Sequence, residues 1–472
     1  MSRKRELAKN TAILTVGRIC SQLVSFFLLP LYTAILSKED YGTFDLFITY
    51  GTLLLPIVNL QLDQGLFRFM LDYRGDDNEL RKIFSSVSCF NVFQCFVFGL
   101  VILIVQSFIR IKHLKFLFFY VVCLSLVMLL QQFVRGLGRS KVYAIGSFIL
   151  ASSTIVFNVF MLVVLKKGIE GLFIATISAQ MITIGYFIIN CKAWRYFSFS
   201  SFNREVLKEV SSYSIPLIPN NLAWWVVNVS DRTVISYFLG VAANGIYTVS
   251  NKFSGAFIQV YNIFNLSWTE TVSLHFDDDD RDEFLSETIT TIFSLFSCAC
   301  FCIVAIMPFI FPLLVNTEYA DAYSQIIILM YAMLLRILVG LYSTVYIAEK
   351  NSKKVATTSF ISAIINLATN IVLISRIGLY AASLSTLLAF GSMAIVRYID
   401  INKSVKMRIK RGIIYSSVII SVVLLVSYYL NNAYINSIVL IAIIVYSYLV
   451  NKDFIKSVIK MIKNKLGKKG TY

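Results

Sequence analysis

The 472-residue sequence has little charge, few prolines and few glycines. Charged residues make up 15% of the chain, whereas about a quarter is usual in soluble domains, so an ordinary soluble protein is excluded. The 6 prolines and 21 glycines, without any low-complexity tract, likewise exclude a disordered chain. The composition therefore points to a folded chain whose surroundings are not water.

Motifs that would supply chemistry are missing as well. No glycine-rich phosphate loop is present, so nucleotide hydrolysis is excluded, and no cofactor is expected. Cys298, Cys300 and Cys302 are close in sequence, but their side chains diverge on a helix and no histidine is near. Neither a metal site nor a disulfide framework is predicted. The acidic run at 277–280 resembles a metal-binding run of glycosyltransferases, but it is uninterrupted and favours a solvated loop.

Long apolar runs are abundant, since hydrophobic residues make up 57% of the chain. A helix needs roughly 20 mostly apolar residues to cross a bilayer. The predicted spans are residues 11–36, 44–70, 83–107, 114–134, 143–165, 168–190, 213–239, 245–270, 288–314, 322–347, 355–375, 378–398, 412–430 and 432–450. The sequence thus predicts an all-α integral membrane protein with about 14 transmembrane helices and no soluble catalytic domain.

The distribution of Lys and Arg predicts the orientation of these spans. With the N-terminus in the cytoplasm, 31 of the 43 cations fall in cytoplasmic segments and 7 in outside loops. The bias predicts a multi-pass membrane protein with an even number of helices and both termini cytoplasmic. His113 and His275 then lie on opposite sides of the membrane and do not complete a catalytic pair. The basic, amphipathic segment at 452–469 is expected to lie on the lipids of the inner leaflet.

The sequence also repeats itself. Gly42 aligns with Gly245 at an offset of 203, and residues 140–158 align with 352–370 with 8 identities in 19 positions. These blocks map spans 1–6 onto spans 7–12, so two parallel six-helix bundles related by pseudo-two-fold symmetry are predicted. The predicted organisation is a bundle at 1–190, a cytoplasmic connector at 191–212, a bundle at 213–400, and two extra helices with a basic tail at 401–472.

Ionisable residues inside the predicted spans are the candidate functional residues, because such groups are costly in hydrocarbon. Five cations, Arg18, Arg68, Arg232, Lys252 and Arg336, stand against the acids Asp63 and Asp231. Surplus cations suit an anionic cargo, since Arg and Lys donate charge-assisted bonds to phosphate or carboxylate oxygens. Arg18, Arg232, Lys252 and Arg336 are therefore predicted to line a cationic, substrate-binding cavity, and Asp63 and Asp231 are the candidates for ion coupling or gating.

Each of these assignments has a structural alternative. Arg18 and Arg336 can instead belong to structural ion pairs, and Asp231 with Arg232 and Lys252 can lock an outer gate. Arg68 is expected to extend to the inner interface. Trp224, Trp225, Tyr261 and Tyr331 are candidates to stack on sugar rings, although a packed or lipid-facing position is the favoured explanation for any single one of them. All six prolines fall in or beside four spans, where they act either as hinges or as static kinks.

Several segments also resemble a known family. Residues 36–44, 135–139 and 213–219, followed by Asp231-Arg232 and the Gly245-Ile-Tyr247 segment, resemble the polysaccharide-transporter branch of the multidrug/oligosaccharidyl-lipid/polysaccharide exporter superfamily, which includes the Wzx-type O-antigen and capsule flippases. The resemblance implies a protein of the bacterial cytoplasmic (inner) membrane, a flippase that moves an undecaprenyl-diphosphate-linked oligosaccharide across that membrane by alternating access. It also implies work beside a polysaccharide polymerase and chain-length machinery, with no role for nucleic acid.

Three other functions remain open from the sequence. A multidrug or cation antiporter of the same superfamily would favour a carboxylate-rich cavity, and a lipid II flippase also has fourteen helices. A membrane polysaccharide polymerase would need a large outside loop or an acid/base constellation, and neither is visible. The chain is therefore expected to be a transporter and not an enzyme.

Overall fold

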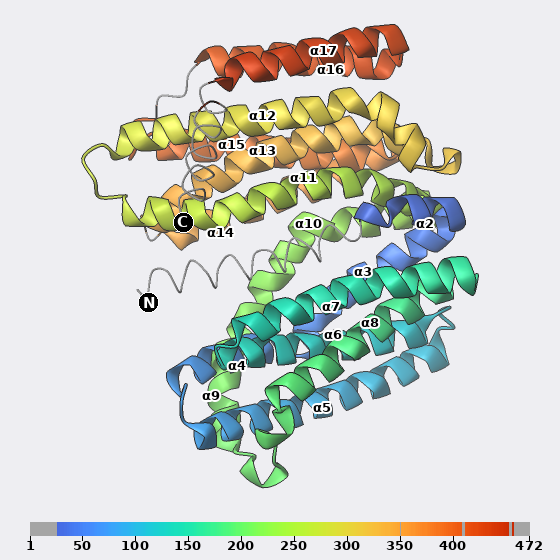
Figure 1. Cartoon of the computed structure of the whole chain (residues 1–472), viewed down its shortest axis with the longest axis vertical. Coiled ribbons are helices and arrows are strands. Elements are labelled where there is room, and N and C mark those ends of the chain that lie inside the picture. The colour runs from blue at the N-terminus through green and yellow to red at the C-terminus, as the bar shows by residue number, and fades with distance from the viewer. Residues whose placement is uncertain (1–25, 350, 408–410, 453–455, 457–472) are drawn as a thin grey trace, which may run out of the picture. The chain divides into compact units, whose positions relative to one another are not determined.

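The computed structural model describes residues 26–349, 351–407, 411–452 and 456, and no strand occurs among them. The chain divides into two compact units, residues 1–248 and 249–472, and the division falls within helix α11 (Val241–Leu274) (Figure 1). Only helices satisfy every backbone donor within their own segment, which is what a chain in lipid requires. The described structure is therefore all-α, with helices suited to a membrane, as the sequence predicts.

Eleven helices of the described residues are long and apolar enough to cross a membrane. They coincide with predicted spans 2–6 and 9–14. The seventh and eighth predicted spans correspond to α10 (Ile218–Leu239) and α11, which are long helices although they are not among the eleven. Most of the first predicted span lies outside the described residues, and its visible end is α2 (Leu29–Ile35).

Unit 1 is a bundle built around α4 and α6. Besides α2, α10 and the start of α11, its helices are α3 (Lys38–Val58), α4 (Leu62–Asp72), α5 (Asp77–Phe108), α6 (Leu114–Gly136), α7 (Ser140–Val159), α8 (Gly168–Cys191) and α9 (Arg204–Ser214). Leu62, Leu66 and Met70 of α4 are fully buried in a core shared with Phe133 of α6. The predicted connector at 191–212 packs on α5, because Ser85 and Ser86 accept hydrogen bonds from backbone amides of the connector. Figure 1 shows α5, α6, α7 and α8 running side by side.

The second predicted span is not continuous. The sequence predicts one helix over 44–70, whereas the chain breaks after α3 and restarts as α4, with Leu60 and Gln61 in the left-handed region. Asn59 stabilises the break, since its side chain accepts a hydrogen bond from the Gln61 amide at 2.9 Å and donates to Asp63 at 3.0 Å. Irregular backbone inside a membrane protein is tolerated where polar groups satisfy it, so hydropathy alone does not reveal it.

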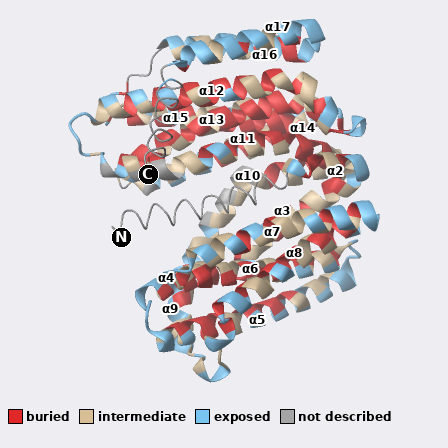
Figure 2. Ribbon diagram, in the orientation of Figure 1, coloured by how far each residue is buried: buried red, intermediate tan, exposed pale blue. Residues whose placement is uncertain are grey.

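Unit 2 is built around one deeply buried helix. Its helices after α11 are α12 (Arg281–Leu314), α13 (Ala322–Ala348), α14 (Ser352–Ile377), α15 (Tyr380–Ile401), α16 (Arg411–Leu430) and α17 (Ala433–Val450). In α13, 67% of the apolar stretch is buried, against 11% in α17. Figure 2 shows this contrast, and α16 and α17 pack on α12 at the edge of the unit. The helix pair outside the sequence repeat is thus also peripheral in unit 2.

The start of α11 meets the start of α3 through two glycines of unit 1. A Cβ on Gly42 would lie 2.1 Å from the Val241 carbonyl oxygen, and a Cβ on Gly245 would lie 2.1 Å from the Lys38 carbonyl oxygen. Gly42 and Lys38 correspond to Gly245 and Val241 at the same offset of 203. The contact is therefore reciprocal between equivalent positions of the two halves, which supports the predicted duplication.

Candidate functional site

Arg336 lies near the middle of α13, on the most buried helix of unit 2. Its guanidinium carbon is 5.6 Å from the ring centroid of Phe390 on α15, a cation–π distance. No carboxylate and no hydrogen-bond acceptor in the described part of the chain contacts this guanidinium. Arg336 is partly exposed, so a ligand can reach it. An arginine this far inside a helix bundle without a counter-charge leaves its charge free for an anion.

Tyr261 of α11 lies beside this arginine. Its hydroxyl would be 2.3 Å from a Cβ on Gly340, one turn after Arg336, so the absence of a side chain at Gly340 makes room for the phenol ring. The Tyr261 hydroxyl donates to Asn265 at 2.9 Å, and its ring packs edge-on against Phe296. Tyr261 is 2% exposed, so it supports the Arg336 site instead of offering a free face to a sugar ring.

Arg232 has a partner that the sequence analysis missed. Its Nε donates to Asp45 of α3 at 2.7 Å, and Asn244 of α11 donates to the Gly42 carbonyl at 3.1 Å beside the same carboxylate. The pair joins α10 to α3 within unit 1. Asp45 falls inside the predicted 44–70 span, so an inventory of acids within spans would have found it.

The remaining predicted site residues are spread over both units. Asp231 is 7% exposed and accepts a hydrogen bond from the Tyr247 hydroxyl at 3.1 Å. Lys252 lies partly buried on α11 in unit 2, and Arg18 falls outside the described residues. The structure therefore does not gather the four predicted cations into one described site. Arg336 is the one of them that lies without a counter-charge in the described part of unit 2.

Asp63 lies in the first turn of α4, at the break in the second span. It is 5% exposed, and both carboxylate oxygens accept amide hydrogen bonds, from Asn59 at 3.0 Å and from Gln64 at 2.6 Å. Asn221 of α10 donates to Gln61 at 2.8 Å and extends the polar cluster. No cation of the described chain pairs with Asp63. A buried carboxylate without a cation is suited to taking up a proton or a small cation.

Arg68 does not pair with Asp63, which lies five residues before it on the same helix. Arg68 instead pairs with Asp72, one turn further along α4, at 2.6 Å, and both side chains are about half exposed. On an α-helix, side chains four residues apart lie on the same face and reach each other, whereas side chains five residues apart point in different directions. Arg68 thus belongs to the exposed end of α4, and its place at the inner interface stays a prediction.

The two tryptophans suggested as sugar-stacking residues both lie on α10. Trp225 is half-buried, and its indole nitrogen donates to the Thr49 carbonyl of α3 at 3.1 Å. The side chain of Trp224 lies outside what the structure describes. Trp225 therefore ties α10 to α3 within unit 1, which accounts for it as a packed aromatic.

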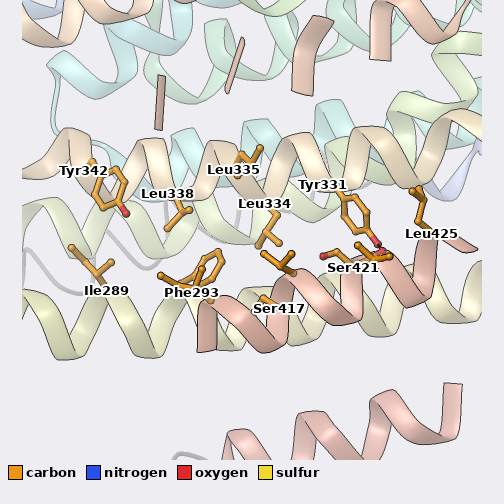
Figure 3. Close-up of a pocket in the computed structure, with 13 residues that line it drawn as sticks. Ile289, Phe293, Tyr331, Leu334, Leu335, Leu338, Tyr342, Ser417, Ser421 and Leu425 are labelled. Carbon is orange, nitrogen blue, oxygen red and sulfur yellow. Dashed lines mark hydrogen bonds between the residues drawn. The ribbon is translucent and has the colours of Figure 1, made fainter. Parts of the chain in front are cut away.

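A cavity of about 410 Å³ lies between α12, α13 and α16 in unit 2 (Figure 3). Leu334, Leu338 and Phe293 are among its walls, and the Tyr331 hydroxyl donates to the Ser421 carbonyl at 2.9 Å. The lining is almost wholly apolar, so it suits a hydrocarbon chain and not a sugar. The suggestion that Tyr331 stacks on a sugar ring therefore loses its support.

Arg397 of α15 is a second buried arginine that the sequence analysis missed. It is 1% exposed and donates to Thr358, Ser359 and Ser343, and to two backbone carbonyls. These acceptors come from α13 and α14, so one side chain ties three helices together. The predicted 378–398 span ends one residue after Arg397, and nothing in the sequence singles this arginine out.

No group of three or more His, Cys, Asp or Glu in the described residues is arranged to hold a metal ion. The cysteines described are reduced, and those at 298, 300 and 302 do not converge, since Cys300 faces the Met330 carbonyl whereas Cys298 faces Asn451. The acidic run at 277–280 is exposed, and Asp278 pairs with His275 at 2.7 Å.

Comparison with known proteins agrees with this architecture. Residues 7–268, more than half of the chain, match the family described as polysaccharide biosynthesis protein. No curated protein matches the chain.

Solved structures with a similar fold are transporters. The inward-closed lipid II flippase MurJ is 16% identical with a TM-score of 0.66, and the match covers 94% of this chain and 100% of that one. An inward-facing multidrug resistance MATE family transporter of the MOP superfamily is 14% identical with a TM-score of 0.65, covering 80% and 93%. A mutant form of the MATE transporter VcmN of Vibrio cholerae is 12% identical with a TM-score of 0.57, covering 86% and 98%. At these identities the likeness establishes the fold.

Proposed function

The chain belongs to the polysaccharide biosynthesis protein family, and from this premise we propose that it is a flippase for an undecaprenyl-diphosphate-linked oligosaccharide. It is a multi-pass membrane transporter of the flippase and exporter type, and its family and structural neighbours are transporters. The cargo is an O-antigen or capsule repeat unit, carried from the cytoplasmic to the outer leaflet of a bacterial inner membrane. Both termini lie in the cytoplasm, as the loop charges predict.

The observation that carries the cargo assignment is the unpaired Arg336. An isolated guanidinium at membrane depth is costly unless a ligand neutralises it. A diphosphate offers oxygens in the geometry that a planar guanidinium binds with two parallel hydrogen bonds. A cationic drug, the cargo expected of an antiporter, would be repelled at this position. The charge at Arg336 thus favours an anionic cargo within the family.

Transport is proposed to be coupled to an ion at Asp63. This carboxylate is buried at a helix break without a cationic partner in the described chain, so a proton or a sodium ion would neutralise it. Loading and release of that ion would alter the polar cluster that joins α4 to Asn221 of α10. A helix that is already interrupted can shift at this point without losing regular hydrogen bonds.

The test is complementation of a glycan-export mutant at matched expression. Arg336→Ala is expected to reduce export at least tenfold, and Arg336→Lys is expected to retain part of it, because a point charge replaces only some of the guanidinium's bonds. Arg376→Ala is the matched control, since Arg376 is an exposed arginine of the same unit at the end of α14. Normal export by Arg336→Ala would refute the assignment of Arg336. Drug efflux by a wild type that complements no glycan pathway would refute the flippase.

A further inference from the structure

A pocket of about 600 Å³ lies where the end of α13, the start of α14 and the end of α15 meet. Polar residues that line it include Lys353, Lys354, Thr357, Asp400 and Lys403. The lysines come from two different helix ends, and the chain folds so that they face one cavity. Neither Arg336 nor the apolar cavity beside Tyr331 contributes to this lining.

Cations outnumber acids around this pocket, which we call the lysine pocket. Asp400 is already engaged, since one oxygen lies 2.7 Å from Lys354 and 3.0 Å from the Tyr346 hydroxyl, and the other lies 3.6 Å from Lys403. Lys353 is exposed and has no ion pair with any described residue. Two lysines thus share one carboxylate, while the third, Lys353, has no acidic partner among the described residues.

Two further charges lie just outside the lining. Arg397 donates only to neutral acceptors, one of them the Thr358 hydroxyl that also lines the pocket, at 3.0 Å. Glu349 accepts a hydrogen bond from Ser404 at 2.6 Å, so its carboxylate is partly engaged elsewhere. Four cations therefore stand against two acids, and the surplus positive charge favours an anion in this pocket.

One side of the lysine pocket is apolar. Val396 and Ile399 of α15 line it and are 49% and 57% exposed, on a helix that crosses the membrane. A free anion in water would gain nothing from these side chains. A lipid would use both features, since its headgroup phosphate needs cations and its acyl chains need an exposed apolar surface next to them.

We propose that the lysine pocket binds the phosphate headgroup of an anionic membrane lipid, whose acyl chains lie along Val396 and Ile399. Lys353 and Lys403 donate to the phosphate oxygens. In the topology that the loop charges predict, this end of the helices faces the cytoplasm, where such basic pockets meet anionic lipids. The site is separate from the cargo site proposed at Arg336 and stands without it.

The test measures lipid binding to the purified full-length chain by native mass spectrometry and thermal unfolding in detergent. Phosphatidylglycerol is expected to bind at least fivefold more tightly than phosphatidylcholine with the same acyl chains. The K353Q/K403Q variant is expected to lose this preference while unfolding at the wild-type temperature without lipid, because both side chains are exposed. K166Q/K167Q removes two exposed lysines elsewhere and is expected to keep the preference.

A second variant distinguishes a lipid from a free anion. Ile399→Ser is expected to weaken phosphatidylglycerol binding several-fold and to leave binding of inorganic diphosphate unchanged. An equal response to inorganic diphosphate and phosphatidylglycerol, unaffected by Ile399→Ser, would mean that a free phosphate occupies the site and would overturn the lipid assignment. Retention of the lipid preference by K353Q/K403Q would overturn the site itself.

Discussion

Two arginines within the helix bundle of unit 2 differ in what surrounds them, and the difference separates a structural role from a binding role. Arg397 is satisfied by five neutral acceptors on α13 and α14. Arg336 contacts an aromatic ring and no acceptor in the described chain. Composition and hydropathy treat the two residues alike, so only the contacts tell them apart.

Arg397→Ala is expected to destabilise the protein by about 3 kcal/mol, because hydrogen bonds to a charged group are strong and their loss leaves buried acceptors unsatisfied. Arg397→Lys is expected to rescue little, since one ammonium does not reach acceptors on two helices. Thermal unfolding in detergent measures both variants. Arg336→Ala serves as the comparison and is expected to unfold at nearly the wild-type temperature. An equal loss of stability in Arg336→Ala would argue against a free binding arginine.

The Asp45–Arg232 pair gives a second prediction at this scale. Both side chains are largely buried, so removing one partner leaves an uncompensated charge. Asp45→Asn and Arg232→Gln are each expected to lower stability, and the double variant is expected to be more stable than the worse single variant. A double-mutant cycle measures the coupling free energy between the two side chains, which is expected to be roughly 1–3 kcal/mol. If the stability losses of the two single variants simply add up in the double variant, the two side chains do not interact.

Asp63→Asn tests the proposed ion coupling. The amide has nearly the same shape as the carboxylate but does not ionise, so the fold is expected to persist while transport loses its dependence on an imposed ion gradient. Reconstituted vesicles with proton or sodium gradients measure this dependence. Asp72→Asn is the matched control, since Asp72 is an exposed acid on the same helix. If transport by Asp63→Asn still depends on the ion gradient, a residue other than Asp63 couples transport to the ion.

At the scale of helices, the contact between α3 and α11 is the feature most sensitive to a single methyl group. Gly42→Ala would place a Cβ against the Val241 carbonyl, and Gly245→Ala would do the same against Lys38. Each is expected to destabilise by about 1–3 kcal/mol, as overpacking does. Gly185→Ala is the control, because nothing lies within 4 Å of the added Cβ and alanine favours a helix. Thermal unfolding that is unchanged in Gly42→Ala would contradict this contact.

The elements that the sequence predicts well are those determined by hydropathy alone. The α13 helix matches its predicted span within one residue, because an uninterrupted apolar run in lipid satisfies its backbone hydrogen bonds by forming one continuous helix. The break between α3 and α4 was not predicted, although Asn59, Gln61 and Asp63 interrupt the apolar run there, because part of the cluster that satisfies the break comes from Asn221, 160 positions further along the chain. Asp45 lies inside the predicted 44–70 span and was readable from the sequence, but its pairing with Arg232, 187 positions away, was not.

At the scale of the whole molecule, the predicted orientation can be tested through cysteine. The native cysteines described are buried or half-buried, so background labelling is expected to be low. Lys167→Cys and Ser200→Cys place thiols at exposed positions on opposite predicted sides of the membrane. A membrane-impermeant maleimide applied to spheroplasts is expected to label only Lys167→Cys, and lysis is expected to expose Ser200→Cys. The reverse pattern would invert the topology and move the lysine pocket to the outer face.

The reciprocal contact of Gly42 and Gly245 also bears on how such a chain arises. Equivalent positions that meet each other across a two-fold axis are the mark of an isologous dimer. A chain of half this length would make the same contact with its own copy, the glycine facing the neighbour's carbonyl on both sides. Fusion of two copies keeps that interface inside one polypeptide and lets the halves diverge. The halves differ in this way at Arg336, since the middle of α6, which corresponds to the middle of α13 in the sequence repeat, carries no cation.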